Sequence, residues 1–208
     1  MPLGLQAEIN FCEESECDRK VPDVTGNGWD VTLYNDAFAS KGLLTLDGND
    51  QYAEFPSGIL SNLTEFTIMC WVNIPQFSSM ARIWNFGEDE GNFISLAASN
   101  GSTGIPVFEA RIDYEEVQRI EISQSIQKDK WVHLAVTFNG SKVSIYIDAK
   151  LVASGNCSVT PSNFSNATQN WIGRSHNSSD PYLVGGIVDF HIHYRSLLVE
   201  QIATFSNG

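Results

Sequence analysis

The sequence predicts an all-β fold, and three observations support this. Short runs of alternating apolar and polar residues recur along the 208-residue chain and end at Gly, Asn, Asp or Pro. This pattern is typical of a β-sandwich or barrel and differs from that of alternating strands and helices. Turn sequences such as Asn139-Gly140 separate neighbouring runs. A helical pattern occurs only near the C-terminus, where Leu198, Ile202 and Phe205 recur at helical spacing.

The predicted strands follow one another at short intervals and are bounded by turn residues. They are expected over residues 42–46, 52–55, 65–74, 81–86, 93–98, 107–112, 117–122, 131–138, 142–147 and 186–194. One short helix is expected over residues 198–205. Since no low-complexity linker divides the chain, we expect a single domain over residues 1–208.

Turn chemistry predicts how some of these strands pair. Asn139-Gly140 lies between the strands 131–138 and 142–147, so we expect a hairpin with a type I′ turn. Alternation in the second strand places Val143, Ile145 and Ile147 on one face, which we expect to face the core.

Composition and charge exclude several classes of partner. The chain is 42% hydrophobic and 18% charged, which is ordinary for a globular protein. Its formal net charge of −13 repels phosphate backbones and anionic lipid, so nucleic acid and membrane surfaces are not expected partners. No stretch approaches the roughly 20 consecutive apolar residues of a membrane span.

Glycosylation sequences indicate an extracellular or cell-surface protein. Seven Asn-x-Ser/Thr sequences occur, more than the roughly two or three that chance would give, and all lie in segments expected to be loops. Their acceptors are Asn62, Asn100, Asn139, Asn156, Asn163, Asn166 and Asn177.

The four cysteines allow three disulfide pairings. Cys12 and Cys17 are close enough in sequence to staple a short N-terminal loop. Cys70 lies inside an apolar run over residues 66–72, where it is either a buried free thiol or a partner for Cys157.

Five segments in a fixed order carry a resemblance to a known family. They are 23–33, with Asp23-Val24-Thr25-Gly26-Asn27-Gly28; 44–48 with 52–56; 66–72; 131–138 with 145–148; and 186–202. Together they resemble the laminin-G-like, pentraxin-like jelly rolls of the concanavalin A-like lectin/glucanase superfamily. The resemblance implies a jelly-roll β-sandwich of two antiparallel sheets. It departs at Ala149, where the family's turn has Gly, and at Val188, which replaces an acid of the closing strand.

The same resemblance implies a calcium ion where the opening loop meets the closing strand. Its ligands would be Asp23, Asn27, Asp30 and Asp189, because calcium is held by carboxylate, amide and backbone oxygens. The alternative is that Asp23 and Asn27 are turn residues that bond their own backbone, and that Asp189 faces solvent.

Evidence for catalysis is weak. No nucleophile motif, phosphate-binding loop or metal-hydrolase pattern occurs. Asp113 and Glu115 share a strand face, but Arg111 stands where the glucanases of the superfamily have their first Glu, so a solvated hairpin end is the simpler interpretation. His191 and His193 share a face at i, i+2 spacing; two ligands do not make a metal site, so we expect solvent-facing strand residues.

The sequence therefore predicts a binding module without enzymatic activity. Its function would be calcium-dependent recognition of a glycan or glycoprotein, outside the cell or at its surface. The alternatives are a structural or adhesive building block that contacts neighbouring protein subunits, and a glycan hydrolase. Aromatic residues in expected loops are candidates for sugar contacts. They are Trp29, Tyr34, Phe77, Phe164 and Tyr182.

Overall fold

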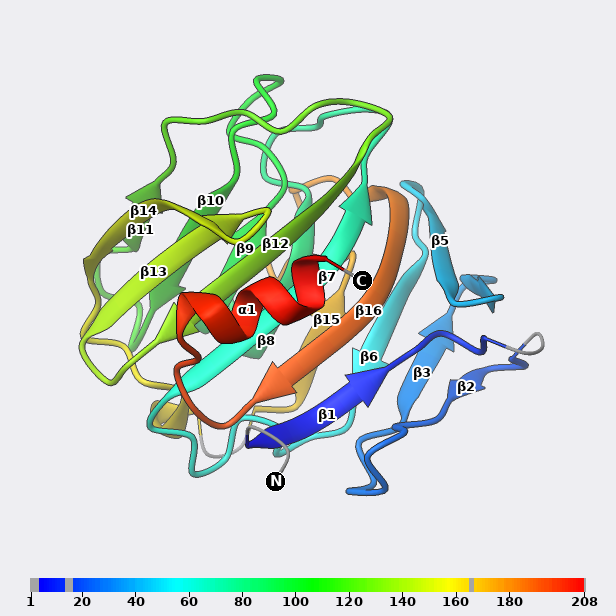
Figure 1. Ribbon diagram of the computed structural model, residues 1–208, viewed down its shortest axis with the longest axis horizontal. Helices are drawn as coiled ribbons and strands as arrows, with labels where there is room; N and C mark the ends of the chain where they lie inside the picture. Colours follow the sequence, from blue (N-terminus) through cyan, green and yellow to red (C-terminus); the bar gives the residue numbers. More distant parts are fainter. Residues whose placement is uncertain (1–3, 14–16, 165–166, 208) are drawn as a thin grey trace.

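The structure is a computed structural model that describes residues 4–13, 17–164 and 167–207. In these residues the strands form two antiparallel sheets that pack face to face, and one short α-helix follows the last strand (Figure 1). The predicted all-β jelly-roll sandwich with a short C-terminal helix is confirmed. No helix within the described ranges has the length and hydropathy that a membrane span requires.

The first sheet, sheet I, contains eight of the described strands in the order β14-β13-β12-β7-β16-β5-β4, with β1 also paired to β16. The strands are β1 (Leu5–Ile9), β4 (Phe38–Ser40), β5 (Leu43–Asp47), β7 (Phe66–Asn73), β12 (Trp131–Phe138), β13 (Lys142–Ile147), β14 (Lys150–Asn156) and β16 (Val184–His193). The last strand lies between β5 and β7, and its second half also pairs with the first strand, β1.

The second sheet, sheet II, also contains eight described strands, in the order β11-β10-β9-β8-β15-β6-β3-β2. They are β2 (Lys20–Val21), β3 (Val31–Tyr34), β6 (Tyr52–Phe55), β8 (Arg82–Asp89), β9 (Asn92–Ala97), β10 (Val107–Arg111), β11 (Gln118–Glu121) and β15 (Gln169–Ile172). The late strand β15 lies between β6 and β8, which is a second crossover between distant parts of the chain.

The core lies between the sheets and follows from the alternation of apolar residues. Val143, Ile145 and Ile147 of β13 are buried, as predicted. Phenylalanine rings join the two layers: the ring of Phe55 on sheet II lies 5.7 Å from that of Phe190 on sheet I. Each sheet therefore has one face committed to the core and one outer face.

The outer face of sheet I is covered in part by the C-terminal helix α1 (Val199–Ser206), drawn in red in Figure 1. Ile202 of the helix is fully buried in a small cluster with Met69 and Ala135 of the sheet. The Trp71 indole donates a hydrogen bond to the Phe205 carbonyl oxygen, at 3.3 Å. The helix is thus fixed by apolar packing and by a side-chain bond to its last turn.

The helix also overturns one expectation about histidines. His191 and His193 were expected to face solvent, but they are only 7% and 1% exposed. Their rings pack on Phe205 of α1, at 5.0 and 5.6 Å. The expectation was wrong because strand alternation alone does not reveal that a helix covers this face.

The turn of the β12–β13 hairpin differs from its predicted form. The β12–β13 hairpin is confirmed, but it closes through a bond from the Asn139 amide to the Lys142 carbonyl, at 3.2 Å. Gly140 has a φ of 92° and Asn139 has no positive φ, so the turn is not type I′. The turn after β13 has left-handed backbone at Asp148 and at Ala149, where the resemblance implies Gly, with φ of 48° and 58°.

Candidate functional site

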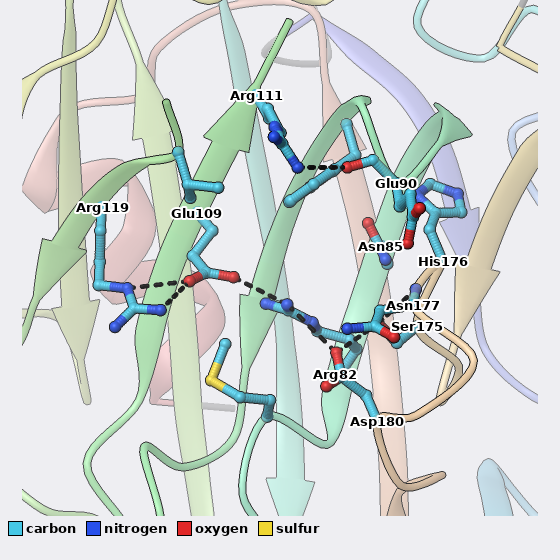
Figure 2. Close-up of a pocket in the computed structure, with 13 residues that line it drawn as sticks. Arg82, Asn85, Glu90, Glu109, Arg111, Arg119, Ser175, His176, Asn177 and Asp180 are labelled. Atoms are coloured by element: carbon cyan, nitrogen blue, oxygen red, sulfur yellow. Dashed lines mark hydrogen bonds and ion pairs between the residues drawn. The ribbon is translucent and has the colours of Figure 1, made fainter. Parts of the chain in front are cut away.

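The outer face of sheet II carries a polar pocket of about 250 Å³ (Figure 2). Its floor follows from strand alternation: Phe108 and Ala110 of β10 are buried in the core, so Glu109 between them faces outward. Strand register then places Glu109 opposite Ser95 of β9 and Arg119 of β11. Polar side chains from neighbouring strands thus line up across the sheet.

A chain of ion pairs crosses the pocket floor. Arg82 of β8 is 4% exposed, and its Nη2 lies 2.8 Å from Glu109 Oε2 and 3.5 Å from Asp180 Oδ2. Its Nη1 donates to Ser95 Oγ at 3.0 Å. The other oxygen of Glu109 accepts from Arg119, whose Nε lies 2.9 Å away. The buried charges are therefore paired, as burial requires.

One wall is the loop that follows β15. Ser175 Oγ donates to Asp180 Oδ2 at 2.7 Å, and the Asn177 amide donates to Ser175 Oγ at 3.2 Å. The His176 ring lies 2.9 Å from the Gln169 carbonyl oxygen. Burial lowers the pKa of His176 to about 4, so this ring is neutral at pH 7. The loop is thus held in one shape against the strands.

Three buried polar atoms of residues that line the pocket have no hydrogen-bond partner within the described residues. One is Nδ1 of His176; the other two are the amide oxygen of Asn85, a residue 1% exposed, and the Nε–H of Arg82. A buried donor or acceptor left without a partner costs about 1–3 kcal/mol. Because Asn85 and Arg82 both line the pocket, a ligand there can satisfy one acceptor and one donor at once.

Beside the pocket, aromatic rings form a row along the same face. The Arg174 guanidinium lies 4.0 Å from the centre of the Trp171 ring and 4.6 Å from that of Tyr52. Tyr52 stacks on Tyr34 at 4.7 Å, and Trp171 contacts His176 at 4.9 Å. The row contacts the loop that follows β15 through the ring of His176. The Arg174 guanidinium packs on the rings of Trp171 and Tyr52.

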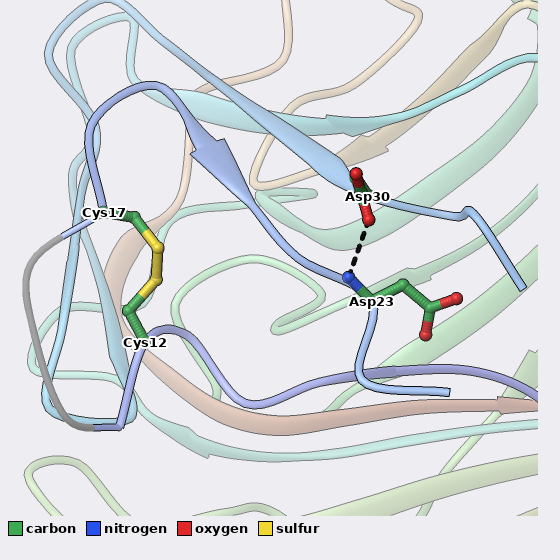
Figure 3. Close-up of a disulfide and its surroundings, with 4 residues drawn as sticks. All are labelled: Cys12, Cys17, Asp23 and Asp30. Carbon is green, nitrogen blue, oxygen red and sulfur yellow. Dashed lines mark hydrogen bonds between the residues drawn. A yellow bond between two sulfur atoms is a disulfide. The ribbon is translucent and has the colours of Figure 1, made fainter. Parts of the chain in front are cut away.

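The proposed calcium ligand Asp23 lies elsewhere, at the opening loop (Figure 3). It is 6% exposed, and its carboxylate accepts bonds from the amides of Glu8 and Thr25, each at 3.1 Å, and of Trp29, at 3.2 Å. This is the turn-residue alternative: the carboxylate organises its own backbone.

Of the other three proposed ligands, two bond to protein groups and one is exposed on a different sheet. Asp30 accepts from the Asp23 amide and pairs with Lys20, each at 3.0 Å, and these two contacts lower the pKa of Asp30. The Asn27 amide group donates to the Gln6 carbonyl at 2.9 Å. Asp189 is exposed on sheet I, at a bulge of β16 where its φ is 51°.

The described residues therefore do not fit a calcium site built from these side chains. No group of three or more His, Cys, Asp or Glu side chains that could hold a metal ion occurs in them, so Asp23, Asp30 and Asp189 do not converge. Calcium stays an implication of the resemblance, and these four side chains do not support it.

Comparison with known families now adds to this geometry. Residues 47–203 match the Laminin_G_3 family, described as the concanavalin A-like lectin/glucanases superfamily. The chain belongs to this superfamily. No curated protein sequence gives a significant match.

Solved structures share the superfamily fold at low sequence identity. Domain 4 of AbnA, a GH43 extracellular arabinanase from Geobacillus stearothermophilus in complex with arabinotriose, has a TM-score of 0.81 and 21% identity over 97% of this chain and 98% of that one. Trypanosoma rangeli sialidase in complex with sialic acid has a TM-score of 0.73 and 17% sequence identity, and the match covers 98% of this chain and 32% of the sialidase. The botulinum neurotoxin serotype D/C binding domain has a TM-score of 0.72 and 17% sequence identity, and the match covers 98% of this chain and 52% of that one.

The disulfide predicted from the spacing of the cysteines is present. Cys12 and Cys17 are bonded and close the N-terminal loop (Figure 3). Cys70 and Cys157 are free and buried, so Cys70 behaves as a small apolar residue. Burial raises the pKa of the Cys70 thiol, which makes it unreactive.

The glycosylation acceptors are mostly placed as predicted. Those that the structure describes are exposed: Asn62, Asn100, Asn139, Asn156, Asn163 and Asn177. Two do not lie in loops, since Asn156 ends β14 and Asn163 ends a 3₁₀ turn over Pro161–Asn163. Asn166 lies outside the described residues.

The remaining candidates separate into surface and core. Asp113 and Glu115 are exposed in the turn after β10, which confirms a solvated hairpin end. Phe77 and Phe164 are buried and act as core residues. Trp29, Tyr34 and Tyr182 are partly exposed, and Tyr34 belongs to the aromatic row.

Sequence reasoning missed the pocket itself. The available signal was charge at outward positions of predicted strands, with Glu109 in 107–112 and Arg119 in 117–122. Arg82, which pairs with Glu109, and Asp180, which pairs with Arg82, come from distant segments that only the sheet order brings together.

Proposed function

We propose that this chain is an extracellular glycan-binding module whose pocket on sheet II holds the sugar. The observation that carries the proposal is the pair of unsatisfied buried atoms, Asn85 Oδ1 and Arg82 Nε, at the floor of a preformed polar pocket. Sugar hydroxyls both donate and accept, so they match such a pair.

The similar structures support this choice of ligand class. The arabinanase domain is in complex with arabinotriose, and a related botulinum neurotoxin binding domain is in complex with SialylT. An extracellular location is supported by the exposed glycosylation acceptors and by the Cys12–Cys17 disulfide.

Binding without catalysis is supported by the state of the carboxylates. A glycoside hydrolase uses two carboxyl groups that flank the scissile bond, one of them a proton donor. Here Glu109 pairs with two arginines, and Asp180 pairs with Arg82 and accepts from Ser175. Both carboxylates are thereby occupied as acceptors by groups of the protein itself.

The test is a glycan array probed with the purified wild-type protein and two variants. Asn85→Ala removes the amide that faces the pocket, and we expect at least about a tenfold loss of affinity, because a hydrogen bond to a buried polar partner is lost. Trp131→Ala, on the outer face of sheet I, is the matched control and should bind as the wild type does. Equal binding by Asn85→Ala and wild type would contradict the proposal.

A second candidate function, contact with a protein neighbour, is favoured by sheet I. Trp131 is 43% exposed there and borders a groove with Leu43 and Gly186. Exposed aromatic residues are enriched in protein interfaces. Sedimentation velocity tests it: this candidate predicts self-association that Trp131→Ala abolishes.

A further inference from the structure

We infer that the pocket on sheet II selects uncharged saccharides and discriminates against sugars that carry a carboxylate. The inference rests on the proposed function and specifies its ligand. Its basis is that the cationic side chains of the pocket are already occupied by the protein's own acceptors.

Arg82 has no guanidinium edge left for a carboxylate. Proteins bind carboxylates strongly through two parallel N–H donors of one guanidinium. The Nη2 of Arg82 lies 2.8 Å from Glu109 Oε2 and 3.5 Å from Asp180 Oδ2, while its Nη1 donates to Ser95. Within the described part of the chain, Nε is the one nitrogen of this guanidinium without any partner, and its single N–H suits a hydroxyl oxygen.

The other two arginines are engaged as well. Arg119 directs both Nε and Nη2 at Glu109 Oε1, as Figure 2 shows. Arg111 donates from Nε to the Glu115 carbonyl at 2.7 Å and from Nη2 to the Tyr114 carbonyl at 2.9 Å. Neither arginine therefore presents a vacant pair of donors aligned for an acidic sugar.

The charge of the pocket is balanced. Among the described residues that line it, Arg82, Arg111 and Arg119 stand against Glu90, Glu109 and Asp180, three positive against three negative charges. The whole chain carries −13, so its long-range field repels an anion. An acidic sugar would lose its hydration and gain no net attraction.

A neutral sugar fits what remains. Asn85 Oδ1 accepts and Arg82 Nε–H donates, and both atoms are buried at the same pocket. Phe93, 6% exposed, adds an apolar ring to the lining. At about 250 Å³ the pocket is smaller than the roughly 300–1,000 Å³ of sites for drug-sized ligands. It therefore suits one terminal sugar residue.

The test compares matched glycans on the wild-type protein. Titration calorimetry uses a neutral oligosaccharide that the array identifies and the same oligosaccharide with a sialic or uronic acid at its terminus. We expect the neutral form to bind at least about tenfold more tightly, because no free arginine fork compensates the carboxylate's desolvation.

A charge variant tests the cause. Glu109→Gln releases Arg119 and one edge of Arg82, so the preference for the neutral form should shrink or reverse. Glu116→Gln, an exposed residue outside the pocket lining, makes the same change in net charge and should leave the preference unchanged. If Glu109→Gln does not fold, as judged by circular dichroism, the wild-type comparison decides alone.

The outcomes separate the inference from the proposed function. Tighter wild-type binding of the acidic form, lost in Asn85→Ala, would overturn the neutral specificity and leave glycan binding at this pocket intact. Absence of wild-type binding to every neutral and acidic glycan on the array would overturn both.

Discussion

At the scale of single residues, Glu109 determines the pocket most directly. Its two carboxylate oxygens contact different arginines, and it is 4% exposed. Removal of one partner of a buried ion pair costs more than the pair contributes, because the remaining charge stays buried without compensation. Arg82 would keep only Asp180 at 3.5 Å as its charged partner.

Replacement of Glu109 by alanine should therefore lower the free energy of unfolding by about 3 kcal/mol. The control is Glu121→Ala on the neighbouring strand, whose carboxylate is 62% exposed and lies 3.8 Å from Arg119. We expect that change to stay within about 0.5 kcal/mol. Urea unfolding at pH 7 measures both, and equal effects of the two substitutions would refute the structural role of Glu109.

Residue-scale prediction from sequence succeeded where the partners are close in the chain. The two cysteines of the Cys12–Cys17 disulfide are five positions apart, and the exposure of the glycosylation acceptors follows from local polarity. Prediction from sequence missed the ion pair between Arg82 and Glu109, because these residues are 27 positions apart and only the pairing of β8, β9 and β10 brings them together.

At the scale of elements, all ten predicted strands and the helix have counterparts in the structure, with shifts of a few residues at their ends. The described residues contain six further strands: β1, β2, β3, β4, β14 and β15. β2 and β4 are too short to show alternation. β14 is an edge strand without a buried residue, and β15 buries the polar Asn170, so neither has the apolar pattern of a strand.

Helix α1 and sheet I enclose histidines that make stability depend on pH. Burial lowers the pKa of His133 to about 4 and that of His191 to about 3, whereas His in an unfolded chain titrates near 6.5. Between these values the unfolded chain binds more protons than the folded one, so stability falls as pH falls. Above about pH 6.5 the effect vanishes.

We expect the free energy of unfolding to fall from pH 6.5 to pH 4, by up to about 1.4 kcal/mol per pH unit for each of these histidines. Urea unfolding across this range measures the slope. His191→Phe should reduce the slope, because it removes one titrating ring and keeps the packing on Phe205. A slope unchanged by this substitution would show that His191 does not contribute.

At the scale of the whole molecule, the two outer faces differ. Sheet I is covered in part by α1, whereas sheet II exposes a pocket lined by four adjacent strands, residues next to their ends and the loop after β15. The jelly-roll order places β15 beside β8, which brings the loop with Asp180 against Arg82. The resemblance predicted the sandwich, but a fold shared by lectins, adhesion modules and hydrolases does not locate a site.

Calcium dependence is tested on the whole molecule by thermal unfolding with calcium and with chelator. An ion that binds only the folded state raises the unfolding midpoint. Because the carboxylate of Asp23 is already occupied by backbone amides, we expect equal midpoints. A rise of several degrees that calcium restores after chelation would instead support the ligand set Asp23, Asn27, Asp30 and Asp189.

The most direct test of the central claim is a nuclear magnetic resonance titration of the labelled protein with a neutral glycan selected on the array. We expect the largest shifts at the Asn85 side-chain amide, the Arg82 Nε–H and the amides of the loop 173–183. Shifts centred on Trp131 and Gly186 of sheet I, with the Asn85 and Arg82 signals unmoved, would contradict the account.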